Sequence, residues 1–163
     1  CTYKTNKFSL SLLNCVGVSP FGSSFLICSA FIQREEKTDY VWALSSLKRL
    51  LQGRRNHLNP RVVVSDNNAA LLKAEEQVFP SATRLICRRY INKNVLAKCK
   101  GHFKSGDEWE RTLVDWNLLC GASSSDEFEA RWADLQAKLH HVPAVTRCLE
   151  TMWIKHKEKF VEA

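Results

Sequence analysis

The feature that most constrains the fold is a run of valines between a proline and an acid, in the sequence Pro60-Arg61-Val62-Val63-Val64-Ser65-Asp66. Consecutive β-branched residues favour a strand that is buried on both faces, as in a parallel sheet covered by helices. Asn67-Asn68 then opens a helical pattern over residues 69–79. The run therefore predicts a buried strand that turns directly into a helix, with Asp66 at the turn.

Two roles are open for Asp66 at this turn. An acid at the C-terminal end of such a strand lies where open α/β sheets bind their ligands. Asp is also a common N-cap residue, so the same side chain is suited to capping the helix that follows. The spacing by itself does not choose between these roles.

Composition indicates a globular protein with a preference for anionic partners. The chain has 163 residues, which suits one domain or one domain with an insertion, and its 45% hydrophobic content is ordinary for a folded core. Its net charge of +7 suits nucleic acid, although many soluble proteins reach that charge. Seven scattered cysteines without a Cys-x-x-Cys pair favour reduced thiols inside a cell. No apolar run approaches the roughly 20 residues of a membrane span.

Hydrophobic periodicity predicts strands and helices in alternation over the first hundred residues. A strand over residues 24–32 is apolar on both faces, so we expect an interior strand, antiparallel to a first strand over residues 10–18. The turn Ser19-Pro20-Phe21-Gly22 joins them. Further elements are expected as a helix capped by Thr38 or Asp39 and ended by Gly53, a strand over 84–87, and a helix over 91–100.

Only helices are expected in the rest of the chain. The patterns predict one helix over residues 108–119, a second with the stripe Phe128, Trp132, Leu135 and Leu139 after a Ser124/Glu127 capping box, and a third that begins at Pro143. The fold class is therefore α/β. It is compatible with a ribonuclease-H-like mixed sheet whose first strand is truncated, followed by an all-α insertion, and also with other mixed α/β folds.

Several segments together resemble the Mutator-like element (MULE) transposase domain, which plant FAR1-type transcription regulators share. The similarity covers about the first hundred residues in order and spacing. It is carried by Cys1-Thr2-Tyr3-Lys4-Thr5-Asn6-Lys7, Leu12-Leu13-Asn14-Cys15-Val16-Gly17-Val18, Asp39-Tyr40-Val41-Trp42-Ala43-Leu44, Val62-Val63-Val64-Ser65-Asp66, Val78-Phe79-Pro80-Ser81-Ala82, Leu85-Ile86-Cys87 and Ile91-Asn92-Lys93-Asn94-Val95. The resemblance divides the chain into a transposase core over residues 1–100, truncated at its N-terminus, and a helical insertion over residues 101–163, truncated at its C-terminus.

The resemblance implies a ribonuclease-H-like DDE transposase that cuts and joins DNA. Such chemistry uses two Mg²⁺ or Mn²⁺ ions held by three acids, because hard divalent ions prefer carboxylate oxygens. Asp66 matches the second acid, so it is the expected catalytic and metal-binding residue. The first acid would directly precede Cys1 and the third would follow Ala163, so the chain reads as an inactive fragment. Transposon ends and target DNA are the implied partners, in the nucleus, with homo-oligomerisation open for the complete parent and no membrane partner.

Two departures from the family pattern favour a decayed or host-adopted copy. Asn67 stands where the family usually has arginine, and Cys87-Arg88-Arg89-Tyr90 stands where it usually has Cys-x-x-His. Tyrosine cannot replace histidine as a proton carrier near neutral pH or as a metal ligand. The alternative function is therefore a domesticated FAR1-like DNA-binding regulator without catalysis.

Basic residues mark the expected nucleic-acid interface. Arg54 and Arg55 follow the first helix, and a second group surrounds the last strand and its helix; the residues expected to contact DNA are Arg54, Arg55, Arg88, Arg89 and Lys93. Lysine and arginine neutralise phosphates, so such binding weakens as salt rises. The alternative is an ordinary solvated surface. Cys99 and His102 have metal-like spacing, but four ligands for zinc are not visible.

Overall fold

The chain folds as two compact units, Cys1–Arg84 and Leu85–Ala163, in a computed structural model that describes residues 6–53 and 59–161. The first unit contains strands and helices, and the second contains helices apart from the end of one strand. The helix expected over residues 91–100 thus belongs to the helical unit, although the family resemblance groups it with the strands. Each unit is described by itself.

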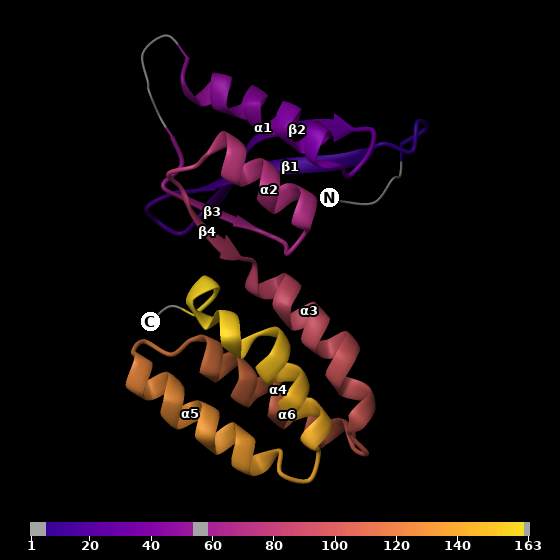
Figure 1. Cartoon of the computed structure of the whole chain (residues 1–163), viewed down its shortest axis with the longest axis vertical. Coiled ribbons are helices and arrows are strands. Elements are labelled where there is room, and N and C mark those ends of the chain that lie inside the picture. Colours follow the sequence, from indigo (N-terminus) through magenta and orange to yellow (C-terminus); the bar gives the residue numbers. More distant parts are fainter. Residues whose placement is uncertain (1–5, 54–58, 162–163) are drawn as a thin grey trace. The chain divides into compact units, whose positions relative to one another are not determined.

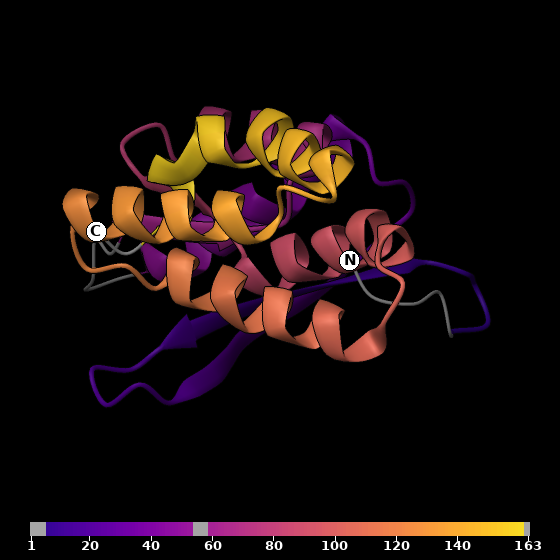
Figure 2. The same cartoon turned by 90° about the horizontal axis from the view of Figure 1, so that it is seen from below.

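Strands β1 (Ser11–Val18) and β2 (Ser24–Ile32) form the predicted antiparallel hairpin, which is seen along its length in Figure 2. Ser11 lies opposite Ile32 and Val18 lies opposite Ser24, with an irregularity between Cys15 and Val16. Gly22 takes a positive φ of 75° in the turn, a conformation that glycine adopts without strain, and its N–H donates to the carbonyl of Ser19 at 3.0 Å.

Helices α1 (Lys37–Leu51) and α2 (Ala69–Val78) supply most of the core of the first unit (Figure 1). Their apolar stripes meet around Leu44, Leu47, Leu71 and Val78, all of which are buried. The N-cap of α1 is Glu36, so capping by Thr38 or Asp39 was wrong; Asp39 instead lies in the first turn and accepts a hydrogen bond from the Arg34 N–H at 2.6 Å.

Over residues 6–53 and 59–161 the strands form two separate two-stranded sheets, with β1 pairing with β2 and β3 (Val62–Ser65) pairing with β4 (Thr83–Ile86). The expectation that β2 is an interior strand was wrong within the described residues, because β1 is the strand that it pairs with and Leu26 is 62% exposed. The expectation that β3 is buried on both faces was also wrong. Val62 and Val64 are 50% and 59% exposed, because only the face with Val63 packs against the helical core.

In its described residues, which end at position 161, the second unit has four α-helices and two short 3-10 helices. The bounds are α3 (Arg88–Cys99), η1 (Lys100–His102), α4 (Gly106–Cys120), α5 (Ser125–Lys138), α6 (Pro143–Met152) and η2 (Ile154–Lys159). Helix α4 packs against α5, and α3 packs against α6 (Figure 1). Within the described ranges, no helix is long and apolar enough to span a bilayer.

The predicted helix signals of α5 were confirmed. The Ser124 hydroxyl accepts from the Glu127 N–H at 3.2 Å, and the Glu127 carboxylate accepts from the Ser123 N–H at 2.7 Å, so the carboxylate binds one residue earlier than in a standard capping box. The stripe from Phe128 to Leu139 is buried. Helix α3 begins at Arg88 rather than at residue 91, which places both Arg88 and Arg89 in its first turn.

Candidate functional site: the carboxylates after β3 and the basic face of α3

Asp66 directly follows β3, as predicted, and does not cap the next helix. Asn68 is the N-cap of α2, and its Oδ1 accepts hydrogen bonds from the N–H groups of Ala70 and Leu71 at 2.9 and 3.0 Å. The capping role that the sequence left open for Asp66 was therefore wrong. Asp66 therefore lies in the turn before α2 but does not cap this helix.

A second carboxylate lies beside Asp66. Glu75 projects from the buried face of α2 and is only 2% exposed, and its Oε2 accepts a hydrogen bond from the Ser65 hydroxyl at 3.2 Å. Asp66 is half-buried, and its Oδ1 has no hydrogen-bond partner among the described residues. Two acids thus lie close together beside the turn after β3, and one carboxylate oxygen of Asp66 is buried without a hydrogen-bond partner among the described residues.

Burial controls the ionisation of this cluster. It raises the pKa of the Glu75 carboxyl, which the negative charge of Asp66 also raises, while the Ser65 hydrogen bond and the charge of Arg84 lower it. Tyr40 of α1 is buried nearby, and desolvation together with the charges of Glu35 and Asp66 raises its pKa to about 12. Burial and the charge of Asp66 therefore both disfavour further negative charge on Glu75 and Tyr40.

Sequence reasoning missed Glu75, although the signal was present. Leu71, Ala74, Glu75 and Val78 share one helical face, and three of the four are apolar. Charged residues are almost never fully buried unless they are paired, so an acid on an apolar stripe points to a partner inside the fold. That partner is Ser65, which the same strand-to-helix turn supplies.

The described residues do not make a magnesium site by themselves. Among residues 6–53 and 59–161 there is no group of three His, Cys, Asp or Glu side chains placed to hold a metal ion. Cys99 and His102, which have metal-like spacing in the sequence, are therefore not part of such a group in the described residues. Burial raises the pKa of the Glu75 carboxyl, so this side chain binds a proton more readily than an exposed glutamate does. Metal binding by Asp66 therefore stays a prediction that needs ligands beyond those described.

The basic residues expected to contact DNA have different environments. Arg54 and Arg55 lie outside the described residues. Arg88 is half-buried, and its Nη2 donates to the Asn117 carbonyl of α4 at 3.3 Å, so it is engaged in packing. Arg89 and Lys93 are exposed one turn apart on α3. Asp66 belongs to the first unit and α3 to the second.

The exposed face of α3 extends beyond the two predicted residues. Lys100, at the C-cap of the helix, is exposed and lies two turns after Lys93. Residues 88–99 contain no aspartate or glutamate. We call Arg89, Lys93 and Lys100 the α3 basic face; its three cations are aligned, reach solvent and have no acid on their own helix.

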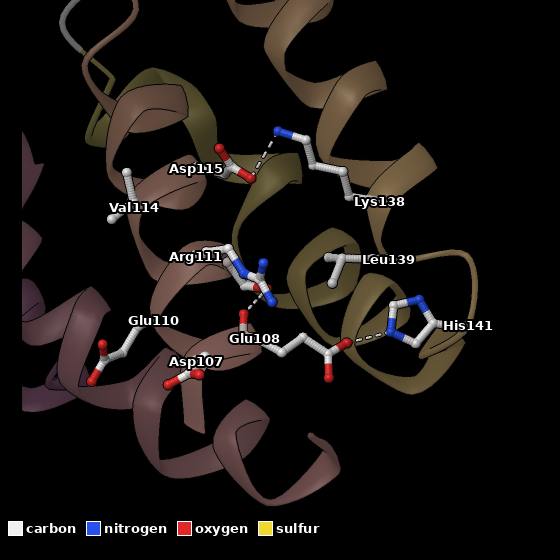
Figure 3. A pocket seen from close by; sticks show the side chains of 10 residues that line it. Asp107, Glu108, Glu110, Arg111, Val114, Asp115, Lys138, Leu139 and His141 are labelled. Carbon is white, nitrogen blue, oxygen red and sulfur yellow. Dashed lines mark hydrogen bonds and ion pairs between the residues drawn. The ribbon is translucent and has the colours of Figure 1, made fainter. Parts of the chain in front are cut away.

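The pocket along α4 is larger than the groove beside Asp66 and is lined by more acidic than basic side chains (Figure 3). It measures about 780 Å³, and its lining includes acids of α4 together with Lys138 and His141. Lys138 Nζ pairs with Asp115 at 2.9 Å and with Asp134 at 2.7 Å, and His141 pairs with Glu108. Lys138 and His141 are thus both paired with acids of their own unit, so we do not assign the pocket to an anionic ligand.

The sequence of the first unit and of the start of α3 matches the model of a known family. Residues 1–94 match the model of the MULE transposase domain. The chain belongs to the MULE transposase domain family. The resemblance inferred from the sequence is thereby confirmed, and the MULE match includes Asp66, Glu75, Arg89 and Lys93.

Similar curated proteins extend the relationship into the helical unit. The chain is 24% identical over 144 residues to the putative protein FAR1-RELATED SEQUENCE 10 of Arabidopsis thaliana, covering 87% of this chain and 20% of that protein. It is 25% identical over 138 residues to FAR1-RELATED SEQUENCE 5 of the same plant, covering 84% of this chain and 17% of that protein. The chain thus spans about a fifth of the length of these relatives.

Proposed function

We propose that this chain is a ribonuclease-H-like, transposase-derived domain that binds DNA through the α3 basic face and does not cut DNA by itself. The observation that carries the proposal is the exposure of Arg89, Lys93 and Lys100 along one acid-free helix. Such a line of cations suits the phosphates of a nucleic-acid backbone, and the net charge of +7 adds a favourable long-range field. Membership of the MULE family supports DNA as the partner.

The proposed lack of cleavage follows from the acids. Divalent ions at a transposase site activate the attacking water and stabilise the leaving oxygen, and they need several carboxylates to hold them. The described residues present Asp66 together with Glu75, which is buried and whose pKa burial raises. Asp66 remains the proposed equivalent of the second acid, with Mg²⁺ or Mn²⁺ binding dependent on further acids.

A host-adopted, FAR1-like transcription regulator in the nucleus is the second candidate for the complete protein. The similarity to two FAR1-RELATED SEQUENCE proteins favours it, and so does Tyr90 at the position where the family usually has histidine. Both candidates require DNA binding, so the test of the α3 basic face comes first.

The binding test compares two triple variants that remove the same charge. Arg89→Ala/Lys93→Ala/Lys100→Ala removes the α3 basic face, whereas Lys73→Ala/Arg147→Ala/Lys155→Ala removes three exposed cations from α2, α6 and η2. Fluorescence anisotropy with a 30-base-pair duplex at several salt concentrations gives the affinity and its salt dependence. If all three cations contact phosphates, the first variant reduces the slope of log K against log salt by about 2 to 3, at about 0.9 per contact.

The control variant should keep most of that slope, because its cations are spread over three elements. Equal losses in the two variants would mean that only net charge attracts DNA, and would overturn the assignment of the interface to α3. Circular dichroism of both variants checks that the helices are retained.

A separate assay tests the absence of cleavage. The chain is incubated with linear DNA and either Mg²⁺ or Mn²⁺, and the products are resolved on a denaturing gel. We expect intact DNA. Specific cleavage that Asp66→Asn abolishes would show that the chain assembles a working site, and the non-catalytic proposal would be wrong.

A further inference from the structure

Three sulfur atoms meet between α3 and α6. Cys99 is the last residue of α3, and Cys148 and Met152 lie one turn apart on the same face of α6. The Cys148 thiol donates a hydrogen bond to Met152 Sδ at 3.7 Å. The thiols of Cys99 and Cys148 are also hydrogen-bonded to each other, so Cys148 contacts both of the other sulfurs. We call these three side chains the sulfur cluster.

The sulfur cluster lies at the margin of the core of the second unit. Cys99 is fully buried within that core, whereas Cys148 and Met152 are half-buried and pack against it. One sulfur is thus held by the interior, and the other two lie on side chains that reach the surface. This arrangement gives an ion from solvent a route to a site whose inner ligand is shielded from water.

A lysine supplies positive charge beside the sulfurs. Lys98 is exposed, and its Nζ donates to Met152 Sδ at 3.3 Å. Burial raises the pKa of Cys99 to about 12, and the hydrogen bond from Cys148 also raises it, whereas the charge of Lys98 lowers it. The cation therefore favours a negatively charged group at this position, which neutral sulfur packing does not require.

The donor set selects the kind of ion. Magnesium and calcium prefer oxygen ligands, and structural zinc is bound by four Cys, His or acidic side chains, of which the cluster supplies two. Thiolate and thioether sulfurs select the soft ion Cu(I). Two thiolates with one Cu(I) leave a single negative charge, which the charge of Lys98 balances. The sulfur cluster therefore matches Cu(I) in both ligand type and charge.

We propose that Cys99, Cys148 and Met152 bind one Cu(I) ion through their three sulfur atoms. Binding releases the two thiol protons to solvent and leaves the copper in its +1 state. Three sulfurs in a plane around a metal, each at about 2.3 Å, lie about 4 Å from one another. The 3.7 Å between Cys148 and Met152 is close to that spacing. The inference goes beyond the proposed DNA binding, which uses other residues of α3.

Binding is measured without oxygen by transfer of Cu(I) from its bicinchoninate complex, whose visible absorbance falls as the metal leaves. The 163-residue chain carries Cys15→Ser and Cys28→Ser, because these residues lie opposite each other on β1 and β2 and form a second pair of thiols. We expect a single Cu(I) per chain. Cys148→Ser should lower the affinity by more than about 100-fold, because losing only an outer partner of a ligand costs about 10- to 100-fold.

Two lysines on the same helix end make a matched comparison. Lys98→Ala should lower the affinity about tenfold, because it removes the outer partner of Met152. Lys100→Ala removes an exposed cation two residues further along and should leave the affinity unchanged. The Arg89→Ala/Lys93→Ala/Lys100→Ala variant should also bind Cu(I) normally, so failure of DNA binding and failure of Cu(I) binding are distinguishable.

Two measurements need no change in the sulfur cluster. With one equivalent of Cu(I), iodoacetamide should no longer label Cys148, whereas labelling of the equally half-buried Cys87 should be unchanged. X-ray absorption should show three sulfur atoms at about 2.3 Å from the copper, and Met152→Leu should leave two. Circular dichroism checks that each variant keeps its helices; if Cys148→Ser loses them, labelling and X-ray absorption of the chain with an intact cluster decide the question.

Three results would overturn the proposal. One is that the folded chain takes no Cu(I) from the bicinchoninate complex. Another is that transfer survives Cys148→Ser at full affinity, or that labelling of Cys148 is unaffected by the metal, because the ion would then be bound elsewhere. The third is a copper environment of nitrogen or oxygen atoms, or of two sulfurs while Met152 is present, because the thioether would then not be a ligand.

Discussion

The Ser65 hydroxyl donates a hydrogen bond to Glu75 Oε2 at 3.2 Å, which joins the last residue of β3 to the buried face of α2. This contact spans the turn that contains Asp66, so it fixes the backbone on both sides of the proposed acid. Desolvation disfavours the ionised form of Glu75, whereas the hydrogen bond from Ser65 favours it. Substitution of Glu75 should therefore change the pH dependence of stability.

Glu75→Gln should make the protein more stable at neutral pH than the wild type. Because the pKa of Glu75 is raised above its ordinary 4.5, the folded state binds this proton more tightly than the unfolded chain does. The free energy of unfolding therefore falls as pH rises from about 4.5 through the higher folded pKa. Glutamine keeps an acceptor for Ser65 and removes this fall.

Urea unfolding between pH 4 and pH 8 measures the effect, with Glu76→Gln as the matched control because Glu76 is the exposed neighbour on α2. The control should follow the wild-type pH dependence. If Glu75→Gln were less stable than the control at pH 7, the charged carboxylate would be the favoured form, stabilised by Arg84.

Asn68→Ala should destabilise the first unit by about 1 kcal/mol, because it removes the acceptor of two N–H groups at the start of α2. Asn67→Ala is the control, since Asn67 is exposed and adjacent. Asp66→Ala should leave the cap intact. Chemical denaturation of the three variants separates the roles of these residues. A loss of about 1 kcal/mol in the free energy of unfolding of Asp66→Ala would contradict the assignment of the cap to Asn68.

Asn92→Leu should destabilise the second unit by about 1–3 kcal/mol, the cost of leaving a buried donor unpaired. The indole Nε1 of Trp116, which is fully buried, donates to Asn92 Oδ1 at 3.0 Å, and Asn92 Nδ2 donates to Asn117 Oδ1 at 2.8 Å. The substitution removes both of these hydrogen bonds between α3 and α4.

Asn94→Leu is the matched control two residues further along α3. Asn94 Oδ1 is buried and has no partner among the described residues, so its removal should cost little or stabilise the unit. Thermal unfolding followed by tryptophan fluorescence compares the two. Equal destabilisation would mean that leucine overpacks this side of α3, and the hydrogen bonds would not be the cause.

Cys120 should react slowly with iodoacetamide in the folded chain. Burial raises its pKa from 9.0 to about 12, so at pH 8 its thiolate fraction is lower by about three powers of ten. Alkylation mapped by mass spectrometry should show this delay, and the delay should vanish in urea. Labelling of Cys120 at the same rate in native and denatured protein would contradict the buried environment.

Local sequence signals predicted most elements because each depends on neighbours in the chain. The turn at Gly22, the cap at Ser124 and the stripe from Phe128 to Leu139 need only the right residues at the right spacing. The same kind of signal failed for the valine strand. Branched residues favour a strand, but whether both faces are covered depends on helices elsewhere, and Val62 and Val64 remain exposed.

The sequence by itself determined the family, the position of Asp66 after a strand and the concentration of positive charge near α3, because motif order, β-branched runs and charge are written along the chain. Only the tertiary structure decided that Asn68 rather than Asp66 caps α2, that Glu75 lies buried against Ser65, and that Arg88 packs while Arg89 and Lys93 face solvent. The physical reason is that burial and hydrogen-bond partners depend on groups distant in sequence, and neighbouring residues of one type are distinguished only by the face of the helix on which they lie.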